Sequence, residues 1–196
     1  MMRMVSMIKM TLVCGAALRI VGAMLCLIML VSSAWADAPL RPEIRAVLAD
    51  AKHTGTARLS LWGFEIYQAN LWTVAGFSAP DYSQHAFALE LEYLRHFSSD
   101  AIAKRSIQEM RRVGNFSATQ ADQWLAQLRA LIPDVQKGDR ITGVNQPGVG
   151  ARFFVNGKAT GEMRDVELAR LFFGIWLSPQ TSEPQMRQSL LGQVVP

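Results

Sequence analysis

The chain has 196 residues, of which 50% are hydrophobic, and its formal net charge is +4 at pH 7. Three basic residues, Arg3, Lys9 and Arg19, lie in the first 36 positions, and the 160 residues beyond Ala36 contain 17 basic and 16 acidic residues. This near-neutral remainder gives no electrostatic support for binding nucleic acid or anionic lipid, and its length suits one domain with a single core.

The first 36 residues have the composition of a cleavable secretory signal peptide. Basic residues precede an apolar run over residues 20–31, and the small residues Ala34 and Ala36 follow it, as signal peptidases require. As a helix, this run would span about 18 Å, whereas the hydrocarbon core of a bilayer is about 30 Å thick. We therefore predict cleavage near Ala36, no stable membrane anchor, and a periplasmic or secreted protein.

Both cysteines, Cys14 and Cys26, fall within the predicted signal peptide. The remaining chain then has no thiol for a disulfide, a nucleophile or a thiolate metal site. The three histidines, His53, His85 and His96, share no spacing that would bring two of them to one ion. We expect neither a metal site nor a cofactor.

The chain beyond Ala36 divides into an N-terminal lead-in over residues 37–55 and one domain over residues 56–196. The lead-in contains Pro39 and Pro42 and is expected to be loose, with a short helix over about residues 43–52.

Residues 56–74 are rich in aliphatic and aromatic side chains and are interrupted at Gly63, which predicts two strands or one long bent pair. If no bulge intervenes, alternation would place Arg58, Ser60 and Trp62 on one face of this pair. The other face would then carry a single charged residue among apolar and aromatic ones: Leu59, Leu61, Glu65 and Tyr67.

A third strand is predicted over residues 87–94, because apolar and polar side chains alternate there. Its dry face is formed by four residues: Phe87, Leu89, Leu91 and Tyr93. Glu90 and Glu92 lie on the other face, which is expected to be wet. This pattern is typical of an antiparallel sheet that is covered on one side.

Helices and further strands follow in separate groups. Ser98 or Ser99 can cap a helix that ends near Val113, and Ser117 with Gln120 resembles a capping box for a second helix. A strand is predicted over residues 140–145, followed by a hairpin that turns at residues 156–157 and by two helices over residues 165–177 and 183–191. Because strands and helices are segregated, the expected fold class is α+β.

Neither a serine nucleophile motif nor a phosphate-binding loop is present, so no catalytic residue is predicted. The polar residues that could line a ligand cavity are Arg58, Tyr67, Tyr93, Arg95 and Arg111. Arginine beside tyrosine suits a carboxylate, because the guanidinium binds it in a bidentate manner and the phenol adds a hydrogen bond. The alternative, that the tyrosines border the core and the arginines are solvated, remains open.

Four segments, taken in order, resemble the exported bacterial branch of the chalcone isomerase-like family. They are GFEIYQANLW at residues 63–72, the strand and its exit at 89–98, KGDR at 137–140 and FFGIWL at 172–177. The resemblance implies an open-faced sandwich, in which a large antiparallel sheet is covered on one face by helices. It also implies a ligand cleft between the sheet and the helices.

The residues that the resemblance assigns to isomerase activity in plant enzymes are largely replaced here. Gln68 stands in the position of a strand threonine and Thr56 in that of an arginine, while residues 168–174 contain no serine or threonine. No tyrosine follows Tyr93. These replacements argue against closure of a chalcone to a flavanone.

The sequence therefore favours a noncatalytic periplasmic module that binds a small amphipathic ligand, such as a fatty acid. One alternative is an isomerase or lyase that acts on an unsaturated carbonyl compound. Another is a ligand-free envelope protein that contacts a protein partner and whose cleft is filled by aromatic side chains. The sequence identifies no such partner.

Overall fold

The computed structural model describes residues 40–193, and the predicted signal peptide and its cleavage site lie outside this range. Six antiparallel strands form one sheet in sequence order. Their bounds are β1 (Lys52–Leu61), β2 (Phe64–Thr73), β3 (Phe87–Tyr93), β4 (Arg140–Gln146), β5 (Gly150–Val155) and β6 (Lys158–Met163).

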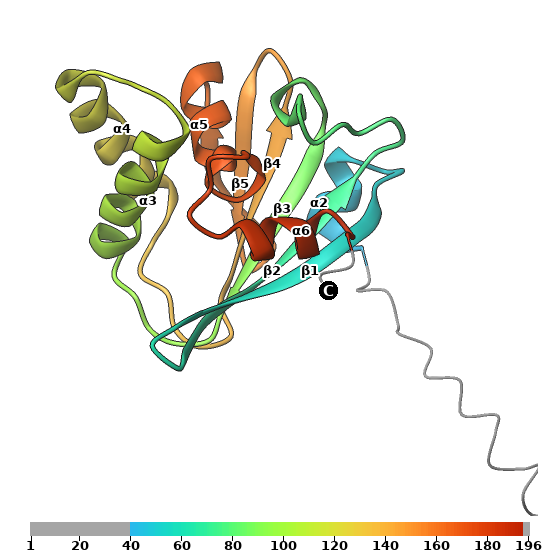
Figure 1. Cartoon of the computed structure of the whole chain (residues 1–196), viewed down its shortest axis with the longest axis horizontal. Coiled ribbons are helices and arrows are strands. Elements are labelled where there is room, and N and C mark those ends of the chain that lie inside the picture. Colours follow the sequence, from blue (N-terminus) through green and yellow to red (C-terminus); the bar gives the residue numbers. More distant parts are fainter. Residues whose placement is uncertain (1–39, 194–196) are drawn as a thin grey trace, which may run out of the picture. The chain divides into compact units, whose positions relative to one another are not determined.

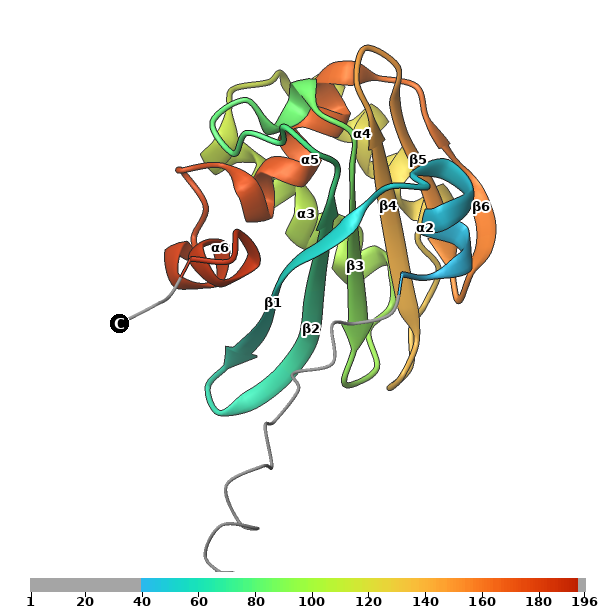
Figure 2. The same ribbon diagram turned by 90° about the vertical axis from the view of Figure 1, so that its right-hand side faces the viewer.

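Helices cover one face of the sheet almost entirely, and one short helix lies on the other face (Figures 1 and 2). The covering helices are α3 (Ser99–Val113), α4 (Ala118–Leu131), α5 (Val166–Leu177) and α6 (Pro184–Leu190), and the short one is α2 (Pro42–Val47). A 3-10 turn, η2 (Tyr82–Gln84), precedes β3. The predicted α+β open-faced sandwich is confirmed. Within the described range, no helix combines the length and apolarity needed to cross a bilayer.

The main core lies between the sheet and the covering helices. The four β3 residues predicted to face the core, Phe87, Leu89, Leu91 and Tyr93, all lie in it. The predicted caps also form: Ser98 accepts a hydrogen bond from the Ala101 amide, and Ser117 and Gln120 make the reciprocal capping box. The capping side chains fix where α3 and α4 begin.

The opposite face of the sheet was predicted to be solvent-exposed, but part of it is buried. Ile44 and Leu48, in and beside α2, pack with Trp72 of β2 and Phe154 of β5 in a second apolar cluster. The predicted helix over residues 43–52 is shorter than expected, since α2 ends at Val47 and β1 begins at Lys52. Part of the expected loose lead-in is therefore packed on the sheet.

Glu90 of β3 is completely buried. Its Oε2 is 3.2 Å from Nε of Arg41 and 3.3 Å from Nε of Arg140, and Glu43 of α2 is also buried nearby. Burial raises the pKa of Glu90, although the two arginines partly offset this effect. The cluster ties the start of the described chain to the middle of the sheet.

The raised pKa of Glu90 predicts a pH dependence of stability. Above the ordinary glutamate pKa of 4.5, the folded state binds more protons at this site than the unfolded state does, so stability falls as pH rises through the raised folded pKa. One group contributes at most about 1.4 kcal/mol per pH unit. Urea unfolding as a function of pH should show that Glu90→Gln removes this negative slope, whereas Glu92→Gln on the same strand retains it. An unchanged slope in Glu90→Gln would refute the assignment.

The first hairpin contains a β-bulge that the alternation pattern did not predict. Leu59 pairs with Tyr67, but the next residue, Ser60, pairs with Glu65, so Ile66 is the additional residue. The bulge turns Glu65 to the face that carries Arg58, with which it forms an ion pair. The placement of Glu65 with Leu59 and Tyr67, which assumed that no bulge intervenes, therefore does not hold, and Glu65 is no longer a charged residue on the apolar face.

Candidate functional site

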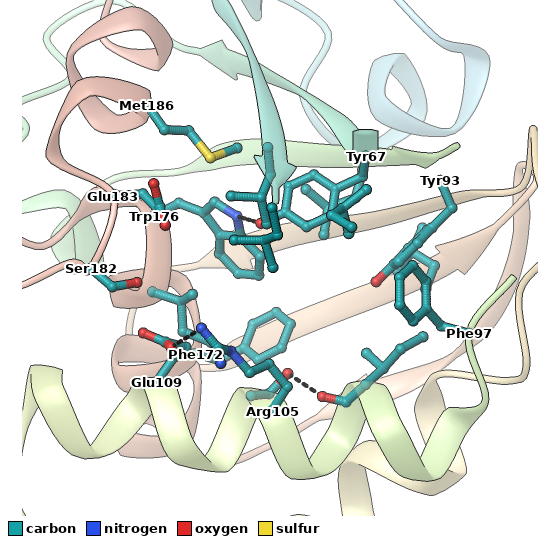
Figure 3. Close-up of a pocket in the computed structure, with 18 of the residues that line it drawn as sticks. Tyr67, Tyr93, Phe97, Arg105, Glu109, Phe172, Trp176, Ser182, Glu183 and Met186 are labelled. Carbon is teal, nitrogen blue, oxygen red and sulfur yellow. Dashed lines mark hydrogen bonds and ion pairs between the residues drawn. The ribbon is translucent and has the colours of Figure 1, made fainter. Parts of the chain in front are cut away.

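A cavity of about 300 Å³ lies between the sheet and the covering helices (Figure 3). Its sheet wall is formed by inward-facing residues of β1 to β4, among them Leu59, Tyr67, Leu91 and Tyr93. The opposite wall comes from α3 and α5, and Met186 of α6 closes one end. Most of the lining is apolar, so the cavity suits the hydrocarbon part of a ligand.

Helical spacing explains which side chains reach the cavity from α3. Ile102, Arg105, Ser106 and Glu109 follow the i, i+3, i+4, i+7 pattern that defines one face of a helix. The Ser106 hydroxyl donates to the carbonyl of Ile102 at 2.9 Å, so its proton is not available to a ligand. The polar groups on this wall that remain for a ligand are those of Arg105 and Glu109.

Tyr67 and Tyr93 stand opposite each other on β2 and β3. Their ring centroids are 5.9 Å apart, with an interplanar angle of 64°. The Trp176 indole nitrogen donates a hydrogen bond to Tyr67 Oη at 3.0 Å, which leaves the phenolic proton of Tyr67 free to be donated. Tyr93 Oη has no hydrogen-bond partner among residues 40–193.

Burial raises the pKa of both phenols, and for Tyr93 the proximity of Tyr67 raises it further. Both side chains therefore remain protonated at neutral pH. In this state they offer two hydroxyl donors to a carbonyl or carboxylate oxygen in the cavity.

Glu109 is 7% exposed and lies between two arginines of the same helix. Arg105 Nη2 is 2.6 Å from Oε1 of Glu109, and Arg112 Nε is 3.4 Å from Oε2. The side chains of both arginines are largely exposed. Glu183, from the segment before α6, also lines the cavity. The apolar interior is thus bordered by one guanidinium and two carboxylates.

Of the five residues predicted to bind a ligand, Tyr67 and Tyr93 line this cavity. Arg58 does not, because its side chain lies on the opposite face of the sheet. It is exposed there, pairs with Glu65, and donates to Gln68 Oε1 at 3.1 Å.

The other two predicted arginines also lie outside the cavity, and each is stacked on an aromatic ring. The Arg95 guanidinium lies 4.7 Å from the centroid of the Phe64 ring. The Arg111 guanidinium lies 4.5 Å from that of Phe116, whose carbonyl it contacts at 3.4 Å. Both arginines are solvent-exposed.

Sequence reasoning did not identify Arg105, Glu109, Trp176 or Glu183. A signal for the first two was available, since Arg105 lies three residues after Ile102 on the apolar side of a predicted helix. Trp176 and Glu183 depend on how α5 and α6 pack on the sheet, for which local spacing gives no signal. Within the described range, no three acidic, histidine or cysteine side chains are grouped to hold a metal ion.

Comparisons with known proteins agree with this architecture. The chain is 25% identical over 134 residues to an uncharacterized protein of Haemophilus influenzae. That alignment covers 67% of this chain and 64% of the relative, so the chain spans less than two thirds of the relative's length.

A similar fold occurs in the crystal structure of a fatty-acid binding protein of Arabidopsis thaliana. The TM-score is 0.58 at 12% sequence identity, covering 73% of this chain and 87% of the plant chain. Residues 48–192 match the sequence profile described as chalcone isomerase-like. The chain therefore belongs to the chalcone isomerase-like family.

Proposed function

We propose that this protein binds a small amphipathic ligand, such as a fatty acid, without transforming it, and that it does so in the periplasm. The observation that carries the proposal is the apolar cavity of about 300 Å³ with donors on its sheet wall and charges at its border. The name of the Arabidopsis protein, a fatty-acid binding protein of the same fold, supports this ligand class. The predicted signal peptide supports the location.

The geometry suggests how such a ligand would lie. Its hydrocarbon part would contact Phe172, Ile175 and the other apolar lining residues, which removes apolar surface from water. Its acidic head would accept hydrogen bonds from the two phenols or from Arg105. Arg105 can turn toward the ligand because Arg112 remains beside Glu109 and still neutralises it.

A pair of arginines on α3 provides a matched test. Arg105 lines the cavity, whereas Arg111 is exposed on the same helix and lies outside it. Arg105→Met should weaken fatty-acid binding by about tenfold or more, because a hydrogen bond to a charged group contributes about 1.5–3 kcal/mol. Arg111→Met should leave binding unchanged. Titration with a fluorescent fatty acid would measure both affinities.

The same protein preparations separate this function from its alternatives. Native mass spectrometry of protein recovered from cells should show a ligand bound at one copy per chain. Equal weakening by Arg105→Met and Arg111→Met would contradict the assigned cavity. Turnover of a chalcone, lost on Tyr67→Phe, would instead support the isomerase alternative. Protein that is recovered empty and binds no fatty acid would support the ligand-free alternative.

A further inference from the structure

The tip of the β1–β2 hairpin exposes two aromatic side chains that core packing does not explain. Trp62 is 97% exposed and Phe64 is 58% exposed. The hairpin extends beyond the neighbouring strands at one end of the sheet (Figure 2). The sequence pattern placed Trp62 within a strand beside Arg58, whereas the structure places it in the turn.

The backbone of this turn is also unfavourable for tryptophan. Trp62 and Gly63 have φ values of 50° and 80°, the left-handed values that a two-residue hairpin turn needs. The β5–β6 hairpin makes the same turn with Asn156 and Gly157, at 51° and 81°. Asparagine tolerates this conformation well, whereas a bulky residue is strained in it. The chain thus places a strained residue where folding alone favours asparagine.

Two cations lie at the same end of the molecule as the aromatic pair. The Arg95 guanidinium lies over the Phe64 ring, 4.7 Å from its centroid. Lys137 is exposed in the next loop. That loop is held beside the end of β3, because the Gly138 amide donates to the Tyr93 carbonyl at 2.7 Å. Neither cation forms an ion pair with another described residue. Exposed tryptophan flanked by arginine and lysine is typical of surfaces that enter the headgroup region of a bilayer.

The hairpin tip also adjoins the cavity. Two cavity-lining residues flank the tip: Leu61 immediately precedes Trp62, and Ile66 lies two residues after Phe64. A surface that contacted the tip would therefore lie next to the cavity wall. Contact at the exposed aromatic pair would therefore bring a partner surface close to the cavity, which a remote surface patch could not do.

We propose that Trp62 and Phe64 insert reversibly into the headgroup region of a phospholipid bilayer, assisted by Arg95 and Lys137. Binding is weak because the chain beyond Ala36 is nearly neutral overall, so aromatic burial supplies most of the attraction. The inference depends on the surface of the hairpin and stands whether or not the cavity holds the proposed ligand.

A variant that improves the turn separates membrane binding from folding. Trp62→Asn reproduces the Asn156 turn and should raise the melting temperature by about 2–4 °C while weakening vesicle binding about tenfold. The protein would begin at Asp37, the first residue after the predicted signal peptide. Cosedimentation with vesicles of phosphatidylcholine, alone or mixed equally with phosphatidylglycerol, measures the binding.

Val149 supplies the matched control. It is 56% exposed in the β4–β5 turn, at the end of the sheet opposite the Tyr67–Tyr93 pair. Val149→Asn should bind vesicles like the unaltered protein. Trp62 fluorescence gives a second readout, because the other tryptophans of the described range, Trp72, Trp124 and Trp176, are buried.

The expected result is a blue shift of tryptophan emission on addition of vesicles, with protection from acrylamide, and loss of both effects in Trp62→Asn. Binding to the mixed vesicles should fall as salt is added. The proposal is overturned if the protein binds neither type of vesicle, or if Trp62→Asn binds as well as the unaltered protein. It is also overturned if Trp62 instead supports a concentration-dependent dimer in ultracentrifugation and no vesicle binding.

Discussion

Gly55→Ala is expected to lower the free energy of unfolding by about 3 kcal/mol, at the upper end of the cost of overpacking. Gly55 lies in β1, directly beneath the end of α6. A Cβ atom there would lie 2.2 Å from the Ser189 carbonyl oxygen and 2.5 Å from that of Leu190. Because both contacts are to backbone, no side-chain rotation can relieve them, and α6 must move away from the strand.

A second glycine provides the control for Gly55→Ala. Gly76 has a φ of 81°, and a Cβ atom there would meet nothing within 4 Å beyond its chain neighbours, so Gly76→Ala tests backbone strain without a clash. That strain should cost about 1 kcal/mol. Urea unfolding would compare the two variants. Fatty-acid affinity should also fall in Gly55→Ala alone, because α6 carries Met186 into the cavity. Equal losses of stability would contradict the close packing of α6 on β1.

The fold could be predicted largely from local patterns. Alternation in residues 87–94 identified the strand at the centre of the core. The capping candidates, Ser98 or Ser99 and Ser117, located the starts of two helices. The Asn156 turn identified a hairpin. Each of these features depends on residues within a few positions of one another, which a single sequence displays directly.

The candidate site was only half predicted. Arg105 and Glu109 had a helical-spacing signal that was not used, whereas Trp176 and Glu183 depend on how α5 and α6 pack on the sheet.

Tyr67 and Tyr93 could be placed from strand alternation. The same alternation put Arg58 on the face opposite Tyr67, and the structure shows it there, outside the cavity. Arg111 could not be placed from local spacing, because its long flexible side chain takes its direction from Phe116.

Two structural features also depart from the alternation pattern. The bulge at Ile66 reverses alternation midway through a strand, and the single charged residue on the apolar face, Glu65, was its only local sign. Glu90 suggested a solvated strand face, but Arg41 pairs with it from 49 positions away and Arg140 pairs with it from the neighbouring strand. Burial of a charge is set by such remote contacts, so local composition alone predicts the wrong environment.

Trp176→Ala is expected to lower the free energy of unfolding by about 3–5 kcal/mol, as for other large-to-small changes in a core. The Trp176 ring packs edge to face against Phe172, with ring centroids 5.5 Å apart. Its indole nitrogen donates to Tyr67, and the side chain lines the cavity. Its removal should therefore enlarge the cavity as well as weaken the core.

Trp124→Ala separates these two consequences. Trp124 is also buried and also donates its indole proton, to Asp165 Oδ2 at 2.9 Å, but it does not line the cavity. Both variants should lose similar stability in urea unfolding. In titrations with a series of chain lengths, only Trp176→Ala should shift the binding preference toward longer fatty acids, because the space that it opens is continuous with the ligand cavity. An identical chain-length preference in both variants would mean that the hydrocarbon part does not reach Trp176, and the ligand would have to lie elsewhere.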